Sequence, residues 1–349
     1  MLALSGKSGA RLGALLAITC TGLTAAACGS SSSSSAPPSA KPSASDSARA
    51  SGPASVAYAA SLEYLNEKVI APAFEKSTGL SYTGLAGPSD GLEAKIASGE
   101  ITPNVFEAVG GDNITPLFPR FTKWYIHYAE TSLVLAYNPN SKYASQFEAI
   151  ASGKEPIKNL FTLMEQPGFK LGRTDPNTDP QGRAFIYMLE LARARYSLPA
   201  DTVSKILGGV AAGSANSPQI FDEATLPARL QAGRLDAASA YAAQAAQLRL
   251  RYISLPAGIN LGDGALAKRY SKASITITGN VTKHGSPLGI DITTIGSKDQ
   301  AAADAFVSFV LSPGGLALHK QAGYALVTPT AYGSAAAIPK SISAELGSS

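Results

Sequence analysis

The sequence has few of the side chains that build disulfide and zinc sites. Its 349 residues include two cysteines and three histidines. Cys20 and Cys28 both lie in the first 28 residues, so the rest of the chain has no thiol and can form neither a disulfide nor a thiolate metal site. The three histidines form no i, i+4 pair. We therefore expect neither a metal site nor a cofactor.

A strong excess of charge is also missing. The formal net charge is +4, but Lys7 and Arg11 belong to a segment that we expect to be removed, which leaves 27 basic against 25 acidic side chains. This near balance leaves no excess of positive charge of the kind that binds nucleic acid, so we expect no nucleic-acid partner. After residue 28 there is no run of 18 apolar residues, so no membrane-spanning segment is expected there either.

Residues 1–28 have the features of an export signal. Lys7 and Arg11 give a basic start, and the apolar run from residue 12 to residue 23 is too short to span a bilayer. The sequence Ala-Ala-Ala-Cys then ends at Cys28, which resembles a bacterial lipobox, although Leu23 lies five residues before the cysteine rather than the usual three. We expect Cys28 to be lipidated; ordinary signal cleavage after Ala27 is the alternative.

Residues 29–54 are rich in serine, alanine and proline, with six serines in succession at 30–35. Such a segment cannot bury enough apolar surface to fold. A flexible chain of about 25 residues has a root-mean-square reach of roughly 25 to 30 Å. We expect a solvated tether that holds the protein outside the cell membrane.

The remaining chain alternates between strand-like and helix-like stretches. Apolar residues recur at helical spacing within 61–79, and a glycine ends the pattern. This alternation predicts an α/β fold with mainly parallel sheets flanked by helices. The expected strands are 55–60, 80–87, 105–111, 132–139, 169–176 and 286–295, and a late helix is expected to follow the last of them.

Three expected strand-to-helix junctions share one chemistry. They contain Ser61, Ser89 and the segment Asp179-Pro180-Gln181-Gly182. Helix N-termini expose unpaired N–H groups and favour anions, and in open α/β sheets these junctions lie where ligands bind. The alternative is that Ser61 and Ser89 are N-cap residues and that Asp179 only caps its helix. Three such junctions in one chain favour an anion pocket.

Most of the chain, from about Val56 to Pro329, resembles the periplasmic molybdate/tungstate-binding proteins of ABC importers. The resemblance rests on four segments: AYAASLEYLNEKVIAPAFEKSTG, GPSDGLEAKIASGEITPNVFEAVGG, GRTDPNTDPQG and LQAGRLDAASAYAAQA. The third is similar to an N-P-x-x-D-P-x-G loop of that family, and the fourth to an E-A-G segment followed by a tyrosine. It departs from the family at Gln231, where the branch that wraps the anion octahedrally has a second carboxylate.

The resemblance implies a two-lobed class II binding-protein fold with a two-segment hinge. Lobe 1 would combine residues 55–131 and 290–345, and lobe 2 would be 132–289. A molybdate- or tungstate-type oxyanion would be held between the lobes and delivered to an ABC permease with its ATPase, and the protein would be a monomer. The implied ligand-binding residues are Ser61, Ser89, Asp179, Gln181, Gly182, Gln231 and Tyr241. Asp179 is placed either to ligate the metal centre of the oxyanion or to accept a proton from it.

Two alternatives remain open from the residues themselves. Sulfate or another small anion would suit the same neutral donors, and Gln231 in place of a carboxylate predicts a weaker preference over sulfate. Gly87-Pro88-Ser89-Asp90-Gly91 also matches the G-x-S-x-G elbow of serine hydrolases, for which His284 or His319 would have to complete a triad. We expect His319 on a surface helix. Trp124, Tyr125 and Tyr128 could form a sugar platform, but we expect them in core or hinge packing.

Two arginines, Arg173 and Arg183, flank the Asp179 loop. They could steer anions toward the cleft, but we expect both at the surface, since the pocket needs no buried cation.

Overall fold

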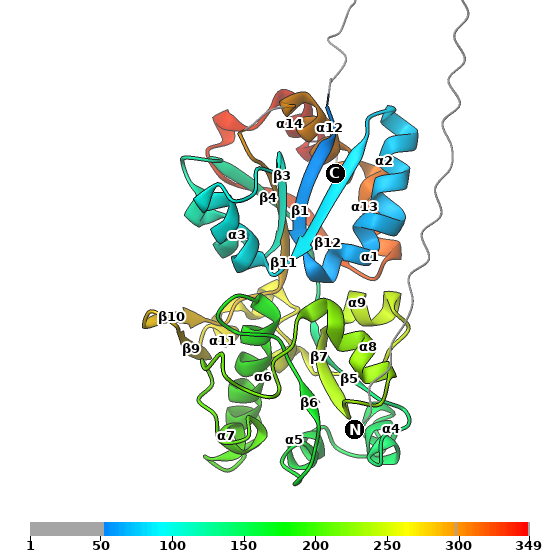
Figure 1. The fold of residues 1–349 in the computed structure, drawn as a ribbon, viewed down its shortest axis with the longest axis vertical. Coiled ribbons are helices and arrows are strands. Elements are labelled where there is room, and N and C mark those ends of the chain that lie inside the picture. Colours follow the sequence, from blue (N-terminus) through cyan, green and yellow to red (C-terminus); the bar gives the residue numbers. More distant parts are fainter. Residues whose placement is uncertain (1–51, 297–298, 348–349) are drawn as a thin grey trace, which may run out of the picture. The chain divides into compact units, whose positions relative to one another are not determined.

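The computed structural model describes residues 52–296 and 299–347. These residues form an α/β fold of two lobes, each with its own β-sheet and flanking helices (Figure 1), so the expected fold class is confirmed. The expected signal at 1–28, the lipidation site Cys28 and most of the expected tether lie outside the described residues. Ala54, which we assigned to the tether, instead begins the first strand and is buried.

The first lobe is built on a six-stranded sheet. Its strands, in spatial order, are β12 (Ala325–Gly333), β4 (Trp124–Glu130), β11 (Gly289–Thr294), β3 (Val105–Val109), β1 (Ala54–Ala59) and β2 (Tyr82–Gly87). Its helices are α1 (Glu63–Leu65), α2 (Ala71–Thr78), α3 (Ser89–Ser98), α12 (Gln300–Leu311), α13 (Pro313–Gln321) and α14 (Lys340–Leu346). The predicted helix at 61–79 is confirmed as a continuous helical stretch ending before Gly79.

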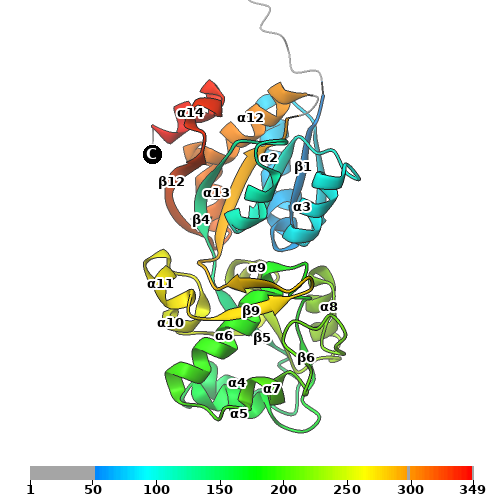
Figure 2. The ribbon, with the colours of Figure 1, turned by 90° about the vertical axis from the view of Figure 1, so that its left-hand side faces the viewer.

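Alternation along the strands divides the core of this lobe into two layers. Val56 and Tyr58 of β1 point to the layer that contains Phe74 and Phe306, whereas Ala57 points to the layer under α3. Figure 2 shows α3 and α12 in this lobe with the strands between them. Because both faces of the sheet are covered, its central strands β3 and β11 are buried along their whole length.

The second lobe has a four-stranded sheet and a separate hairpin. The sheet order is β6 (Leu171–Gly172), β7 (Ala237–Tyr241), β5 (Leu133–Tyr137) and β8 (Arg251–Ser254), and β9 (Ser274–Ile277) pairs with β10 (Val281–His284). Its helices are α4 (Ala144–Ala151), α5 (Lys158–Met164), α6 (Pro180–Tyr196), α7 (Thr202–Ile206), α8 (Leu226–Gln231), α9 (Ala242–Gln247), α10 (Ala257–Asn260) and α11 (Ala267–Tyr270). Helix α6 packs on one face of the sheet and α8 on the other.

The prediction of mainly parallel sheets is wrong. In the first lobe β1 runs parallel to β2 and β3, but β11 and β4 pair antiparallel with their neighbours. In the second lobe only β6 and β7 are parallel. A helix between successive strands of one sheet enforces parallel pairing, but strands that cross between lobes have no such connection and their direction is free.

The chain leaves the first sheet after β4 and returns to it at β11. The two crossing segments are hydrogen-bonded to each other, because the Thr131 N–H donates to the Leu288 carbonyl at 3.0 Å. The late helix is broken into α12 and α13 at Ser312, since Pro313 begins the second piece. Among the residues that the structure covers, no single helix is long and apolar enough to cross a membrane; α12 and α13, bent by 61°, meet the criterion only as a pair.

Candidate anion-binding cleft

A cavity of about 570 Å³ lies where the two lobes meet. The first lobe contributes the residues that follow β1 and β2, and the second lobe contributes the Asp179 loop and the 3-10 turn Glu223–Thr225. The residues that argue for its chemistry are Ala60, Gly87, Pro88, Thr174, Asp179 and Glu223. Residues next to all three predicted junctions therefore line this cavity, but Ser61 and Ser89 themselves do not. Ser61 lines a neighbouring cavity of about 670 Å³, together with Gln231.

Asp179 is the N-cap of α6. Its Oδ1 accepts a hydrogen bond from the Gln181 N–H at 2.8 Å, and Pro180 occupies the first helical position. Its carboxyl group is buried, and this desolvation raises its pKa from 3.8 to about 7 against the opposing hydrogen bond from Gln181 and the charge of Arg183. The capping role that we weighed as an alternative is therefore real, and Asp179 also lines the cavity.

Gln181 joins Asp179 to a second carboxylate, Glu223. Its Nε2 donates to Glu223 Oε1 at 2.6 Å, and its own Oε1 accepts from Ser239 Oγ at 2.8 Å. Burial raises the pKa of Glu223 well above its ordinary value, and the neighbouring Asp179 carboxylate raises it further. Two carboxyl groups thus share one buried network, and each makes ionisation of the other harder.

The structure places a carboxyl group beside Asp179 from a position other than the one that the sequence indicated, and Gln231 instead lines the neighbouring cavity together with Ser61. Gln231 is exposed at the end of α8 and does not line the cavity that contains Asp179. Glu223, eight residues earlier, is buried beside Asp179 instead. The sequence around Glu223, Phe-Asp-Glu-Ala-Thr-Leu-Pro, shows only an acidic pair before a proline-led helix and gives no signal that one acid turns inward.

Gly182 is required by its own loop. A Cβ atom at this position would lie 2.5 Å from the Thr174 carbonyl oxygen and 2.8 Å from the Pro176 nitrogen. Gly182 is one of the implied ligand-binding residues, but the group that approaches it in the structure is the backbone of residues 174–176. The helix N-terminus can therefore pack against that loop only if residue 182 has no side chain.

Ser61 and Ser89 are both buried but neither is an N-cap residue. Ser61 lies inside a 3-10 turn, and its backbone N–H lowers the pKa of Glu223 in the opposite lobe by hydrogen bonding. Ser89 is the first residue of α3, and its Oγ accepts a hydrogen bond from the Val109 N–H at 3.1 Å. The N-cap explanation is therefore excluded for both serines.

Tyr241 ends strand β7 with its side chain buried. Its hydroxyl has no hydrogen-bond partner among the described residues. Burial raises the pKa of Tyr241 well above its ordinary value, and the charges of Asp179 and Glu223 raise it further, so both carboxyl groups lie nearby. A buried hydroxyl without a partner carries a desolvation penalty. Tyr241 is not among the residues that line the cavity at Asp179, and its role as a ligand donor stays a prediction.

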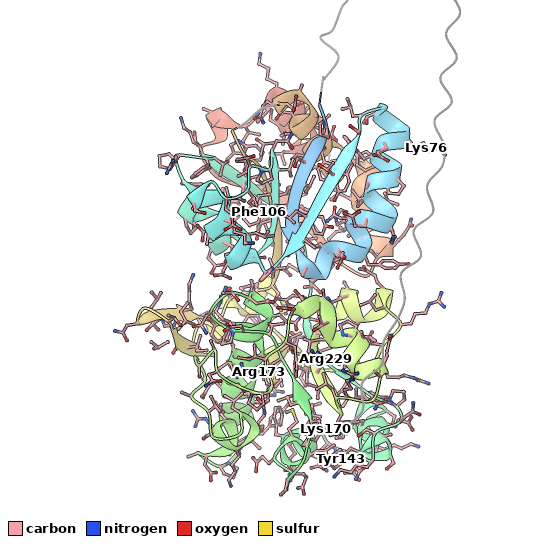
Figure 3. The ribbon with its side chains drawn as sticks, viewed as in Figure 1. Lys76, Phe106, Tyr143, Lys170, Arg173 and Arg229 are labelled. Carbon is pink, nitrogen blue, oxygen red and sulfur yellow. The ribbon has the colours of Figure 1, made fainter. Side chains whose placement is uncertain are left out.

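Both arginines of the Asp179 loop are buried, contrary to expectation. The Arg183 guanidinium pairs with Asp90 in the first lobe at 2.8 Å. Arg173 is fully buried within the second lobe, where its Nε donates to Gln219 Oε1 at 3.3 Å (Figure 3). The Arg183 head has acceptors for its buried donors, whereas Nη1 and Nη2 of Arg173 have no partner among the described residues.

The histidines do not complete a triad with Ser89. His127 Nδ1 lies 3.1 Å from Asp291 Oδ1, and His284 Nδ1 lies 3.3 Å from the Ser271 carbonyl. His319 is buried rather than exposed as we expected, because α13 packs against the sheet and sets its Nε2 3.1 Å from the Tyr128 hydroxyl. Tyr128, like Trp124, lies in the core, as expected.

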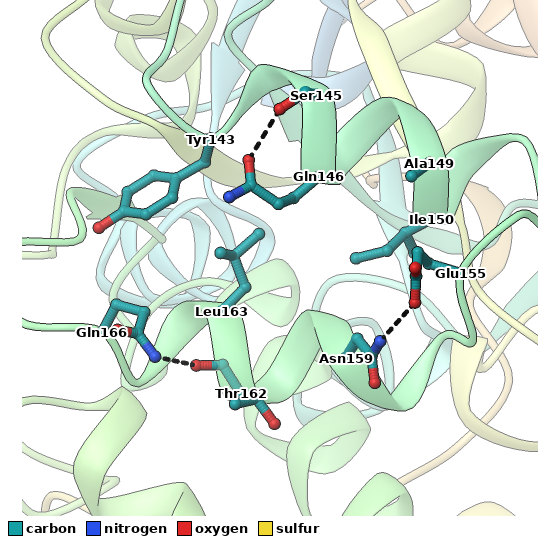
Figure 4. Close-up of a pocket in the computed structure, with 10 residues that line it drawn as sticks. All are labelled: Tyr143, Ser145, Gln146, Ala149, Ile150, Glu155, Asn159, Thr162, Leu163 and Gln166. Atoms are coloured by element: carbon teal, nitrogen blue, oxygen red, sulfur yellow. Dashed lines mark hydrogen bonds between the residues drawn. The ribbon is translucent and has the colours of Figure 1, made fainter.

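A second cavity lies on the second lobe alone. It is a groove of about 660 Å³ between α4 and α5, lined by Tyr143, Leu163 and several amide side chains (Figure 4). Its polar groups bond to one another, as Glu155 does with Asn159 at 2.8 Å. It shares no residue with the cavity at Asp179.

The raised pKa of Asp179 makes the stability of the empty protein depend on pH. The folded state holds a proton that the unfolded chain releases above pH 3.8, so stability falls as pH rises to about 7 and the loss persists above it. Asp179→Asn keeps an acceptor for the Gln181 N–H and removes the ionisation. We expect it to stabilise the protein by roughly 1 to 3 kcal/mol at about pH 8 and by much less at about pH 4, measured by urea unfolding.

The matched control for this prediction is Glu190→Gln on the outer part of α6, where the carboxylate is half-exposed and pairs with Arg193. The change that Glu190→Gln makes in the free energy of unfolding should be the same at about pH 4 and at about pH 8, unlike the change made by Asp179→Asn. A constant difference between Asp179→Asn and the parent protein across the pH range would show that Asp179 ionises normally.

The chain is similar to binding proteins of ABC transporters. It is 33% identical over 170 residues to a putative molybdenum-binding protein of an ABC transporter from Haloferax volcanii, covering 49% of this chain and 50% of that protein. It is 28% identical over 233 residues to the molybdate/tungstate-binding protein of Pyrococcus abyssi, covering 61% and 65%. The chain thus spans between half and two thirds of the length of these curated relatives.

The fold is also similar to that of a solved structure. The periplasmic molybdate-binding protein of Azotobacter vinelandii matches with a TM-score of 0.52 and 18% identity over 78% of this chain and 98% of that one, a likeness that concerns the fold alone. The family model described as bacterial extracellular solute-binding protein matches residues 54–325. Since this match covers most of the sequence, the chain belongs to the family of bacterial extracellular solute-binding proteins.

Proposed function

We propose that this protein is the substrate-binding component of an ABC importer and that its cleft holds a tetrahedral oxyanion, with molybdate or tungstate preferred. The observation that carries the proposal is the buried, unpartnered hydroxyl of Tyr241 beside Asp179 and Glu223. The names of the two relatives described above support the choice of ligand. The permease and its ATPase are the partners that this role requires.

The donors of the cleft suit an oxyanion. The N-terminus of α6 faces the cavity at Asp179, and α3 begins beside it at Ser89, so the positive ends of both helices lie near the ligand. Tyr241 adds a hydroxyl, and Ser61 adds a backbone N–H that Glu223 also uses. Neutral donors of this kind bind anions at helix N-termini, and the half-buried Arg229, which also lines the cavity, adds a positive charge.

The two carboxyl groups argue for molybdate or tungstate over sulfate. Beside a fixed dianion a carboxylate repels, unless it is protonated or its oxygen contacts the metal centre. Molybdenum and tungsten can accept further oxygen ligands and sulfur in sulfate cannot. The weaker preference over sulfate that we expected from Gln231 no longer follows, because Glu223 supplies the second carboxylate.

Calorimetric titration with molybdate, tungstate, sulfate and phosphate tests the proposal directly, and Tyr241→Phe tests the site. We expect the variant to lose roughly 1.5 to 3 kcal/mol of binding free energy for molybdate or tungstate, the range for a hydrogen bond to a charged group. Its stability without ligand should not fall, because the hydroxyl has no partner in the described structure. Gln231→Ala, at an exposed position, is the control and should bind as the parent does.

Equal affinity of Tyr241→Phe and the parent protein would remove Tyr241 from the site. Absence of heat with all four anions would contradict the oxyanion proposal as a whole.

We further propose that the protein binds and does not catalyse. Ser89 is buried and its hydroxyl is held by the Val109 N–H, and each histidine has another partner. A serine nucleophile needs a base within hydrogen-bonding reach. Ester hydrolysis by the parent protein that disappears in Ser89→Ala would overturn this part of the proposal.

Membrane anchoring is proposed from the sequence, within an extracytoplasmic location that agrees with the family. A lipid on Cys28 and the serine-rich tether after it would hold the lobes outside the membrane. Cys28→Ala should then move the protein from the membrane fraction to the soluble fraction, with tungstate affinity unchanged because the tether separates the lipid from the cleft. Cell fractionation followed by titration measures both. A variant that still sediments with membranes would contradict lipidation at Cys28.

A further inference from the structure

Arg183 occupies an unusual position for a cation. It lies in the first turn of α6, where the helix dipole favours negative charge, and its side chain is buried. A charge that is both desolvated and placed at the wrong end of a helix is unfavourable unless strong partners compensate it. The partners of Arg183 therefore indicate what it is for.

These partners tie the two lobes together. Arg183 Nη2 donates to Asp90 Oδ2 at 2.8 Å, with 4% and 17% of the two side chains exposed, and Nη1 donates to the Pro176 carbonyl at 3.2 Å. Asp90 lies in the first turn of α3 in the first lobe. One residue on, the Gly91 N–H donates to the Thr178 carbonyl at 3.3 Å, again between lobes.

The ion pair stands next to the cleft without lining it. Pro88, which precedes α3, and Asp179, which precedes α6, both line the cavity, whereas Asp90 and Arg183 do not. A second pair between the lobes, Lys283 with Asp112 at 3.6 Å, is much more exposed. Because exposed pairs contribute little, the buried Arg183–Asp90 pair is the stronger link.

We propose that Arg183 and Asp90 form a closure latch, which holds the two helix N-termini together and sets the fraction of the empty protein that is closed without touching the ligand. The pair exists only while the lobes are in contact at this point, so opening separates and rehydrates both charges. Apparent affinity scales with the fraction of the protein in the binding-competent state. The effect on affinity rests on the proposed oxyanion function, whereas the effect on closure does not.

Asp90→Asn is the first test. It leaves Arg183 buried and unpaired in the closed form, so opening becomes more favourable, and we expect tungstate affinity to fall about tenfold. The double variant Asp90→Asn with Arg183→Gln removes both charges and should recover at least part of that loss. Asp201→Asn, which breaks an exposed pair with Lys205 within α7 and its N-terminal flank, is the matched control and should change nothing.

Closure itself is measured on the empty protein. In the full chain, Cys20→Ser and Cys28→Ser leave no native thiol, and Ser98→Cys and Ser204→Cys place one spin label on an exposed residue of each lobe. Pulsed electron resonance should show longer label distances in Asp90→Asn than in its Asp90 parent, at an unchanged melting temperature. A purely structural role for Asp90 would lower the melting temperature and leave the distances alone.

Identical distance distributions in Asp90→Asn and its parent would overturn the latch. If Asp90→Asn does not fold, Arg183→Lys is the variant to use, because it keeps the charge and the apolar stem but lacks the planar head. It must show a smaller increase in label distance than the one expected for Asp90→Asn. A folded Arg183→Lys with the parent's distances and affinity would also overturn the proposal. If no oxyanion binds the parent, the proposed function fails, and the label distances still decide whether the latch exists.

Discussion

The structure of the cleft depends on one constraint, the burial of two carboxyl groups around a single glutamine. Gln181 offers its backbone N–H to Asp179 and its side-chain amide to Glu223, so the two acids are held in one network by the first turn of α6. No cation bonds to either carboxyl among the described residues; the nearest, Arg183, is already paired with Asp90. Uncompensated buried charge is expensive, so this cleft is stable only when it holds protons or a ligand that takes their place.

Much of the fold could be predicted from periodicity and junction chemistry. The helical stretch ending before Gly79, the strand at 105–109 and the start of α3 at Ser89 follow patterns that local propensity determines. Strand direction could not be predicted in the same way. Whether β11 runs parallel or antiparallel to β3 depends on how the chain returns from the second lobe. The local sequence of the 158 residues between β4 and β11 does not indicate that direction.

The sequence predicts the position of a site residue when neighbouring residues determine it. It does not predict the burial of a side chain by segments that are distant in the sequence. Asp179 follows from its place before Pro180, which signals an N-cap whatever the tertiary structure. Glu223 lies in a short turn whose sequence would suit a solvated loop, and it is buried only because the two lobes meet there. The same reason explains Arg183, whose partner Asp90 is 93 residues away.

The cleft thus keeps the buried Arg183 away from the ligand position, while Arg229 of α8, which lines the cavity, lies 4.2 Å from the centroid of the Phe221 ring. An arginine facing a dianion would bind sulfate, phosphate and molybdate alike, since charge attraction hardly distinguishes them. Pairing Arg183 with Asp90 instead leaves helix N-termini, a tyrosine hydroxyl, two carboxyl groups and the half-buried Arg229 around the proposed ligand position. In the oxyanion site that we propose, the carboxyl groups repel any anion that cannot engage their oxygens, so part of the discrimination would arise from the penalty on the wrong ligand rather than from extra attraction to the right one.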